Sequence, residues 1–503
     1  MTTNLRRAIL YTHRWLGIAG GLLFVLWFAS GIAMLWARMP ELDSAERLRR
    51  LPELDLDAAR VAPVEAARAL GLSNSGLRIA MLGERPVYRF DTGPRSTTVF
   101  ADDGQPFAGL GDDEVMRLAR ALFPEHAATL RHDRRLESPD QWTLQNGGAL
   151  PLHRLALGDP GDTWIYLSAP TGELILTATA SERRRAYASA VPHWLYVTPL
   201  RRHGVLWSRM VVGLSLAGCV VAASGLIWGL WQALRAGDRS SRARVATPYA
   251  GLMRWHHYAG LAFGLFAFTW VLSGCLSMDP LPWQSYAEPT VEQAAAVAGE
   301  PIRLEALTID RLRASLAALA AEPEWTVKEL ELVHFRSEPF LLGHGSPPSS
   351  TQSSPHALVS ALRAERGAFA RFGDDDVVAA ARSAMPAARV IDATWLQRHD
   401  AYYYDLHGPA PLPVLRARFD DPARTWLYVD PATGAIARME NRSSRLNRWL
   451  YHGLHSFDFP FLLRHRTLRD AIIVVLSLGG ILIAVTSMAD GWRRVGRHVR
   501  RLR

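Results

Sequence analysis

Four histidines stand at matching places in the two halves of this 503-residue chain. His13 and His256 lie 243 residues apart, inside stretches that match at that constant offset, and His193 and His455 lie 262 residues apart inside a second ungapped register. Neutral imidazoles ligate haem iron, and a b-type haem is held by two such ligands facing each other across its plane. The two registers therefore predict two haem sites, one between His13 and His256 and one between His193 and His455.

The same histidines have a plainer explanation. A histidine at the end of a membrane helix also serves as an interfacial anchor beside aromatic residues, and Trp15, Trp194 and Trp255 stand close to these positions. For one histidine alone, anchoring is the better explanation. Two pairs in register favour ligation, with anchoring kept as the alternative.

Four further histidines are second choices as iron ligands: His203, His257, His452 and His465. His203 and His465 also share the offset of 262 residues, but each stands in an arginine-flanked stretch, which suits anchoring or contact with haem propionates better than ligation. Alanine and arginine occupy the places of His452 and His257 in the other half, so neither histidine extends the symmetric set.

The elements that must position these histidines are four apolar runs. They cover approximately residues 16–36, 211–231, 261–278 and 471–488, and each is close to the about 20 residues needed to cross a hydrocarbon core. Facing helices of a four-helix bundle are where cofactor sites of this kind are built. Glycines recur in these runs at four-residue spacing, which favours close helix packing: Gly17, Gly21, Gly260 and Gly264.

Arginines indicate which side of the membrane each segment faces. Residues 1–14 carry three arginines, residues 232–254 carry five with one aspartate, and residues 490–503 carry six with one aspartate, so the net charge of +9 is concentrated in these segments. The positive-inside rule places them in the cytoplasm, and this charge therefore gives no reason to expect nucleic acid as a partner. The first apolar run is long and no small-residue cleavage site follows it, which predicts an uncleaved anchor rather than a signal peptide.

The predicted domain organisation follows from these runs. In chain order it comprises the cytoplasmic N-terminus with the first membrane helix (1–37), an exported domain (38–205), the second helix (206–231) and a cytoplasmic loop (232–254). The third helix (255–278), a second exported domain (279–469), the fourth helix (470–489) and a cytoplasmic tail (490–503) follow. Gly111–Val115 recurs as Gly373–Val377 at the offset of 262 residues. The fold class is therefore a four-helix transmembrane bundle with two duplicated, exported α+β domains.

Each exported segment alternates short helical patterns with antiparallel strands, as small α+β layers do. In the first segment, strands are expected near residues 141–145, 150–157 and 163–168. In the second, the Pro- and Ser-rich stretch 343–355 is expected to form a solvated loop.

Several motifs are missing from the sequence. Cys219 and Cys275 are the only cysteines and both lie in apolar runs, which excludes an exported disulfide framework and covalent c-type haem. The sequence has no Walker loop, no strand-linked G-x-G-x-x-G and no H-E-x-x-H motif. The chain therefore offers no nucleotide or flavin domain, and electrons would have to come from quinol, from another membrane donor or from a partner protein.

The stretches around the histidines resemble the PepSY-associated transmembrane family. The strongest are Trp255–Pro280, Val191–Leu200 and His452–Pro460, and the likeness extends over nearly the whole chain. It implies a protein of the bacterial inner membrane with four helices and PepSY-like periplasmic α+β domains. It also implies iron-linked physiology, because some members of the family are ferric-siderophore reductases that carry b-type haem.

The residues and the resemblance together predict an inner-membrane di-haem b protein with both termini in the cytoplasm. It would pass electrons from quinol or another membrane donor to a periplasmic acceptor, with ferric-siderophore iron as the favoured one, and so act as an oxidoreductase in iron uptake. A rival hypothesis is a non-redox binding or regulatory protein whose helices only anchor the periplasmic domains in the bilayer. Transport is least favoured, because the repeats are parallel and the sequence shows no broken helices.

Overall fold

The computed structural model describes residues 2–502 except 73–75, 92–95, 238–246, 282–285, 300–303, 322–325, 347–355 and 406–409. The chain divides into two units, which we name the helix unit (residues 1–39, 182–285 and 443–503) and the sheet unit (residues 40–181 and 286–442). Each unit has apolar clusters of its own.

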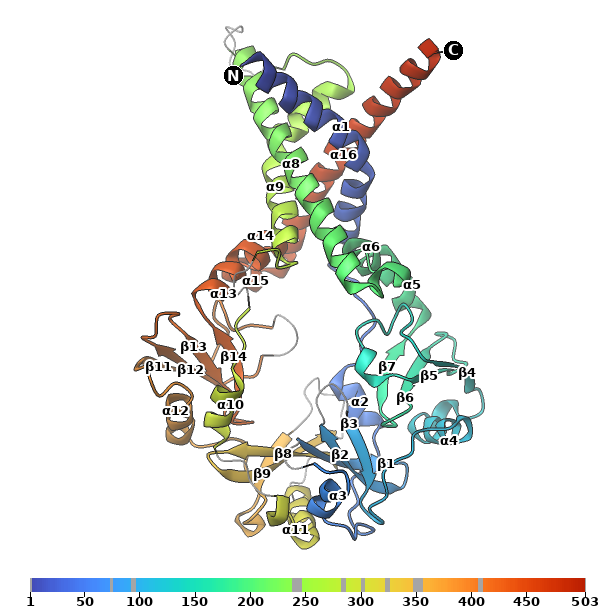
Figure 1. The fold of residues 1–503 in the computed structure, drawn as a ribbon, viewed down its shortest axis with the longest axis vertical. Helices are drawn as coiled ribbons and strands as arrows, with labels where there is room; N and C mark the ends of the chain where they lie inside the picture. Colours follow the sequence, from blue (N-terminus) through green and yellow to red (C-terminus); the bar gives the residue numbers. More distant parts are fainter. Residues whose placement is uncertain are drawn as a thin grey trace. The chain divides into compact units, whose positions relative to one another are not determined.

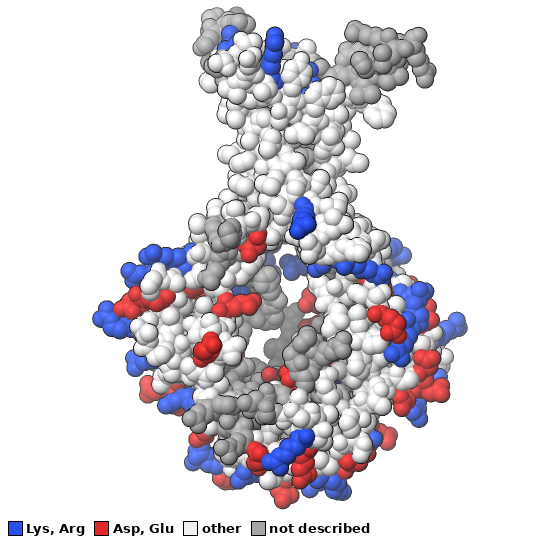
Figure 2. Space-filling view, in the orientation of Figure 1, with Lys and Arg blue, Asp and Glu red and all other residues white. Residues whose placement is uncertain are grey.

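The helix unit is built on four long helices: α1 (Thr3–Ala33), α8 (Gly204–Gly237), α9 (Leu252–Leu276) and α16 (Arg466–Leu502). All four are long and apolar enough to cross a membrane, which confirms the prediction of four membrane helices. Helix α1 packs against α8 and α16, and α9 packs against the same two helices, so the four close into a bundle (Figure 1). Figure 2 shows hardly any charged side chains on the visible face of this bundle apart from a few near its ends.

Two groups of short helices precede α8 and α16: α5 (Ala180–Ala188), α6 (Ala190–Trp194) and α7 (Thr198–Arg201) in the first, and α13 (Arg442–Asn447), the π-helical turn Arg448–Gly453, α14 (Leu454–Ser456) and α15 (Pro460–Arg464) in the second. Helix α6 packs against α1, and α14 packs against α9. Because of this packing, residues 182–205 and 443–469 belong to the helix unit, although the sequence assigned them to the exported segments.

The sheet unit contains a six-stranded antiparallel sheet in the order β10-β9-β8-β1-β2-β3. Its strands are β1 (Leu77–Leu82), β2 (Arg85–Asp91), β3 (Ser96–Phe100), β8 (Thr326–Phe335), β9 (Glu338–Ser346) and β10 (His356–Ser360). Helices α3 (Pro63–Ala69) and α11 (Ile309–Ala320) contribute apolar side chains to the core on one of its faces. The sheet is continuous because β1 pairs with β8, where Ile79 lies opposite Leu330 and both side chains are fully buried.

This continuous sheet differs from the prediction of two separate exported domains. Strand β1 belongs to the predicted domain 38–205 and β8 to the predicted domain 279–469, yet they are neighbours in one sheet. Two three-stranded sheets would each leave an edge strand with unpaired backbone N–H and C=O groups. Pairing β1 with β8 satisfies both edges at once.

Two four-stranded antiparallel sheets complete the sheet unit, each following a helix. The first has α4 (Asp112–Leu122), β4 (Arg131–Leu136), β5 (Leu152–Ala156), β6 (Trp164–Ser168) and β7 (Leu174–Ala178), and the second has α12 (Asp374–Ser383), β11 (Val390–Leu396), β12 (Val414–Phe419), β13 (Trp426–Val429) and β14 (Ile436–Glu440). Their registers correspond at an offset of 262 residues: His153 lies opposite Leu167, and Leu415 lies opposite Val429. The prediction that the chain has antiparallel α+β layers in addition to its membrane helices is confirmed.

One predicted strand is wrong. Residues 141–145 form bends and turns, and the first strand of that sheet is β4. Strand β4 has the sequence Arg-His-Asp-Arg-Arg-Leu, and most of its side chains are exposed, so no alternation of apolar residues reveals it.

The remaining short elements connect these layers: α2 (Ser44–Arg50), α10 (Val291–Ala298) and the 3-10 turns Pro124–His126, Gly147–Ala149, Leu304–Ala306 and Ala364–Arg366. Of the loop predicted at residues 343–355, residues 343–346 instead form the end of β9, and residues 347–355 lie outside the described residues.

Candidate functional site

The helix unit brings the four predicted histidines together as two pairs. His13 of α1 and His256 of α9 face each other with ring centroids 6.0 Å apart and ring planes inclined by 47°. His193 of α6 and His455 of α14 lie at the same centroid distance of 6.0 Å, inclined by 64°. Two imidazole nitrogens on opposite sides of one metal ion, each about 2 Å from it, put the ring centroids about 6 Å apart. Each pair is therefore spaced so that its two imidazoles could hold one metal ion between them.

Helical periodicity explains why the rings of the first pair point inwards. Trp15 and Trp255 lie within two positions of His13 and His256, and residues so close in sequence face different directions on a helix. The two tryptophans are 58% and 60% exposed, as expected for side chains that meet lipid. Anchoring is thus available from the tryptophans, and the imidazoles are turned into the bundle.

A backbone carbonyl of a neighbouring helix orients each ring of the first pair. His13 donates from Nδ1–H to the carbonyl oxygen of Val221 in α8 at 3.0 Å, and His256 donates from Nδ1–H to that of Ile483 in α16 at 3.1 Å. Because a carbonyl only accepts, the proton resides on Nδ1 and the lone pair of Nε2 is available to a metal. The two acceptors, Val221 and Ile483, are themselves 262 residues apart.

The second pair is oriented in the same way by α1 and α9. The Nδ1 atom of His193 lies 3.2 Å from both the carbonyl oxygen of Trp27 and the hydroxyl oxygen of Ser30. The corresponding acceptors of His455, 243 positions further along and at 3.2 and 3.1 Å, are Trp270 and Ser273. In both halves the serine hydroxyl donates to a backbone carbonyl of its own helix, so it accepts the imidazole N–H.

The short helices that carry the second pair end in the same unusual conformation. Leu195 follows α6 with φ +54°, and Phe457 follows α14 with φ +52°. A left-handed residue other than glycine costs about 1–3 kcal/mol and persists only where the surroundings impose it, typically near functional sites. The chain thus accepts strain at equivalent places, two residues after each histidine.

Burial keeps the second pair uncharged. It lowers the pKa of His193 to about 4, with a further contribution from His455, and it also lowers the pKa of His455. Both rings are therefore neutral near pH 7, as an iron-ligating imidazole has to be.

A cavity of about 390 Å³ adjoins the first pair. Its volume falls within the range of about 300–1,000 Å³ that is usual for cofactor and ligand sites. Besides His13 and His256 it is lined by glycines of all four long helices: Gly17, Gly21, Gly225, Gly229, Gly260, Gly264, Gly480 and Gly491. A Cβ atom added at Gly225 would lie 2.5 Å from Cε1 of His13, whereas one added at Gly260 would meet nothing within 4 Å. The glycine at position 225 therefore gives room to the imidazole of His13, and the glycine at position 260 leaves open space in the cavity.

The glycine spacing noted in the sequence therefore has two effects. At Gly21 and Gly264 an added Cβ would lie 2.6 Å from Met488 and 3.0 Å from Leu226, so these glycines allow close helix packing, as predicted. At Gly260 the small residue enlarges the cavity instead.

The second-choice histidines are placed differently from the pairs. His257 lines the same cavity, but its Nδ1 lies 2.9 Å from the Thr247 hydroxyl and its Nε2 lies 3.0 Å from the Gly229 carbonyl oxygen, so both ring nitrogens are engaged. His452 is buried in the π-helical turn, with its ring centroid 4.4 Å from that of Tyr451. The remaining two, His203 and His465, are exposed.

The groups that orient the rings were not predicted from the sequence. Ser30 and Ser273 stand in a repeated Ser-Gly dipeptide at the offset of 243 residues, which was the available signal. The glycines of those dipeptides, Gly31 and Gly274, lie against the rings: a Cβ added at either would be 3.4 Å from Cε1 of the adjacent histidine, in van der Waals contact.

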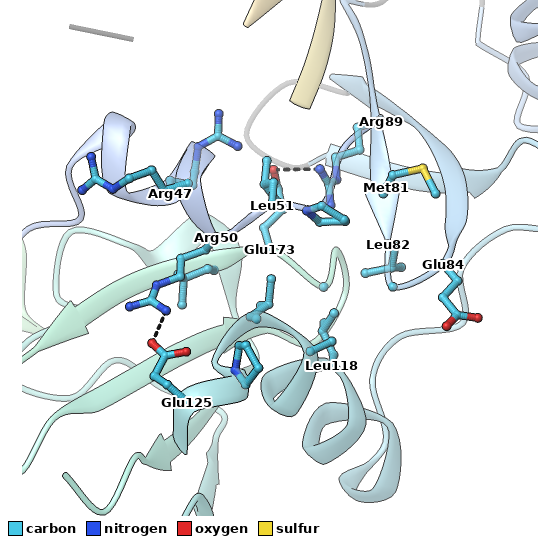
Figure 3. Close-up of a pocket in the computed structure, with 18 residues that line it drawn as sticks. Arg47, Arg50, Leu51, Met81, Leu82, Glu84, Arg89, Leu118, Glu125 and Glu173 are labelled. Atoms are coloured by element: carbon cyan, nitrogen blue, oxygen red, sulfur yellow. Dashed lines mark hydrogen bonds and ion pairs between the residues drawn. The ribbon is translucent and has the colours of Figure 1, made fainter. Parts of the chain in front are cut away.

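A second cavity, of about 470 Å³, lies in the sheet unit and is lined by four arginines: Arg47, Arg49, Arg50 and Arg89 (Figure 3). Arg89 of β2 is only 1% exposed, and its Nη1 lies 3.6 Å from a carboxylate oxygen of Glu173. Among the described residues, neither Nε nor Nη1 of Arg89 has a hydrogen-bond acceptor. Burial acts to raise the pKa of Glu173, but the charges of Arg89 and Arg78 outweigh it and hold that pKa below its usual range. The carboxylates of Glu84, Glu125 and Glu173 line the same cavity, where Arg50 pairs with Glu125.

Four apolar helices long enough to cross a membrane define a multi-pass membrane protein embedded in a lipid bilayer, and its helix unit holds two oriented pairs of half-buried histidines. The chain belongs to the PepSY-associated transmembrane family, whose transmembrane region matches residues 253–503, as the resemblance indicated. That region contains all of α9 except Leu252, the whole of α16, and both His256 and His455. No curated protein matches the chain.

Proposed function

We propose that this chain is a di-haem b electron-transfer protein of the bacterial inner membrane that reduces a periplasmic acceptor, with ferric-siderophore iron as the favoured one. The observation that carries this proposal is the equivalence of the two histidine pairs. In each pair, hydrogen bonds at Nδ1 fix both rings 6.0 Å apart and leave Nε2 available to a metal. Two interfacial anchors would not need this orientation.

His13 and His256 would hold one haem, and His193 and His455 the other. Neutral imidazoles, apolar walls and glycine-lined space are what a non-covalent haem requires, and bound haem supplies one-electron redox chemistry. The chain's own residues would orient the imidazoles through carbonyl bonds and exclude water from the first site with Phe24 and Phe28, which line its cavity. At both sites this fit rests on donor chemistry, and at the first site it rests also on the open space beside Gly260 in the cavity.

The two sites would lie near opposite faces of the bilayer. His13 and Trp27, whose carbonyl accepts from His193, are 14 residues apart on α1, which at about 1.5 Å per residue separates the pairs by about 20 Å along the helix. That is most of the about 30 Å of a hydrocarbon core. The arginine-rich segments would face the cytoplasm, so the His13–His256 site would receive electrons there and the His193–His455 site would deliver them on the periplasmic side.

The equivalence of the sites is explained if the two halves arose by duplication. The acceptors of the paired histidines correspond at offsets of 243 and 262 residues, and so do the registers of the two four-stranded sheets. A duplication would have produced both haem sites and both α+β layers in one event.

The motifs that the chain lacks indicate its electron donor, and the cavity that it offers indicates its electron acceptor. The sequence has no nucleotide or flavin motif, so the electrons would come from quinol or another membrane donor. The arginine-lined cavity is suited to an anionic chelate, because guanidinium groups bind carboxylate oxygens through paired N–H donors. Ferric siderophores with hard oxygen ligands belong to this class, and reduction to ferrous iron favours release.

The test is the absorption spectrum and the haem content of the full chain purified in detergent from haem-replete cells. We expect two haems per chain and, after reduction, the split visible bands of six-coordinate haem. A variant in which all four paired histidines are replaced by alanine should be colourless but still insert in the membrane, whereas a matched His203→Ala and His465→Ala variant should keep both haems. A colourless wild-type protein would refute the proposal and leave the non-redox binding or regulatory function.

A further inference from the structure

Three side chains with metal-binding atoms meet in the first four-stranded layer of the sheet unit. His132 of β4 and His153 of β5 approach to 3.1 Å between Nε2 and Nδ1, and Asp112 at the start of α4 lies 3.9 Å from the same Nδ1 atom. One ligand atom of each lies within 4.8 Å of the other two. Three separate elements thus converge on one point, which the sequence analysis did not single out.

The buried histidine of this cluster is already oriented as a ligand. His153 is fully buried and donates from Nε2–H to the carbonyl oxygen of Leu110 at 3.0 Å, which leaves the lone pair on Nδ1 directed at His132. A hydrogen bond from the distal ring nitrogen to a carbonyl is the usual device that fixes a metal-binding imidazole. Burial also lowers the pKa of His153, so the ring is neutral near pH 7.

The matching sheet shows that the fold does not need these residues. At the offset of 262 residues, the places of Asp112, His132 and His153 are taken by Asp374, Thr394 and Leu415. Leu415 is fully buried in an apolar cluster. Where the second layer has the core leucine Leu415, the first layer has the imidazole of His153, with the imidazole of His132 beside it. Burying these polar groups costs free energy.

We propose that Asp112, His132 and His153 bind a divalent transition-metal ion in this layer. Two imidazole nitrogens and one carboxylate suit zinc and its neighbours and are poor ligands for calcium or magnesium, which prefer oxygen donors only. Three protein ligands leave coordination positions for water or a small ligand. The Asp112 side chain is 76% exposed, so the ion reaches the site from solvent. The proton that His132 now donates to His153 moves to the other nitrogen of the His132 ring or to solvent when the metal binds.

The test uses the full chain, purified without a polyhistidine tag, stripped with a chelator and dialysed against Zn²⁺. We expect wild-type protein to retain one more tightly bound zinc per chain than His132→Ala, and we expect Asp112→Asn to weaken binding at that site at least tenfold. The control is His356→Ala, which removes an exposed histidine of β10 and should leave the zinc content unchanged. Equal zinc content in wild type and His132→Ala would overturn the proposal and leave only a hydrogen bond between two histidines.

A second variant separates metal loss from misfolding. His153→Leu introduces the residue of the matching sheet, so it should fold, and zinc should no longer raise its thermal unfolding midpoint as it does in the wild type. The zinc K-edge X-ray absorption spectrum of the wild type, after subtraction of that of His132→Ala, should show scattering from two imidazole ligands. Oxygen ligands alone in that difference would also overturn the site. Both readouts compare variants of the sheet unit, so they stand whether or not the helix unit binds haem.

Discussion

His193 and His455 face each other with ring centroids 6.0 Å apart, although 262 residues separate them in the chain. A tryptophan carbonyl and a serine hydroxyl on a membrane helix hold Nδ1 of each ring. The same relationship recurs between His13 and His256, with carbonyl acceptors on α8 and α16. In both pairs, acceptors on neighbouring helices therefore orient Nδ1 of each ring, and each pair can be tested separately.

Removal of one ligand should empty one site only. We expect His13→Ala to lower the haem content from two per chain to one and His193→Ala to do the same, because each histidine belongs to a different pair. The measurement is a haem count by pyridine haemochrome, with His203→Ala as the control that keeps both. Loss of both haems from either single variant, in protein that still unfolds cooperatively, would contradict independent sites.

A methyl group placed against His13 should act like the loss of the ligand. In Gly225→Ala the new Cβ would lie 2.5 Å from Cε1 of His13, so the ring must leave its present position opposite His256. We expect the first haem to be lost or bound at least tenfold more weakly. Gly213→Ala is the matched control on the same helix, because a Cβ there meets nothing within 4 Å. Similar haem retention in the two variants would show that the position of His13 is not required.

The hydroxyl acceptors should tune the second site without abolishing it. Ser30→Ala removes one of the two acceptors of His193 Nδ1 and leaves the Trp27 carbonyl in place. Loss of an orienting partner typically weakens metal binding by about 10–100-fold, so we expect faster haem loss to an apo-globin acceptor and a shifted midpoint potential. Ser215→Ala, at a buried serine of α8, should change neither quantity. An unchanged potential in Ser30→Ala would argue against a ligand role for His193.

The arginine-lined cavity predicts a defect in substrate binding. Arg89→Leu removes a buried guanidinium, and hydrogen bonds to charged groups contribute about 1.5–3 kcal/mol, so KM for an anionic ferric chelate should rise about tenfold or more while kcat stays close to that of the wild type. The control is Arg85→Leu, whose guanidinium pairs with Asp102 and Asp103 instead. An unchanged KM in Arg89→Leu would place the chelate elsewhere.

The sequence alone determined the elements whose signals are local or repeated. Four apolar runs are long enough to span a bilayer, so α1, α8, α9 and α16 could be predicted from hydropathy. The constant offsets of 243 and 262 residues singled out His13, His193, His256 and His455, since each histidine of a pair stands in a stretch that matches the stretch around the other. Strand β4 could not be found in this way, because its mostly exposed, charged side chains carry no alternating pattern.

Only the tertiary structure decided which distant groups meet. The carbonyls of Val221 and Ile483 have no side-chain signature, yet they fix the rings of His13 and His256. The pairing of β1 with β8 joins two predicted domains, because each edge strand satisfies the backbone groups of the other. His132 and His153 likewise converge only when β4 and β5 pair. The physical reason is common to all three: periodicity and composition act within one segment, whereas hydrogen bonds and burial between segments depend on how the whole chain packs.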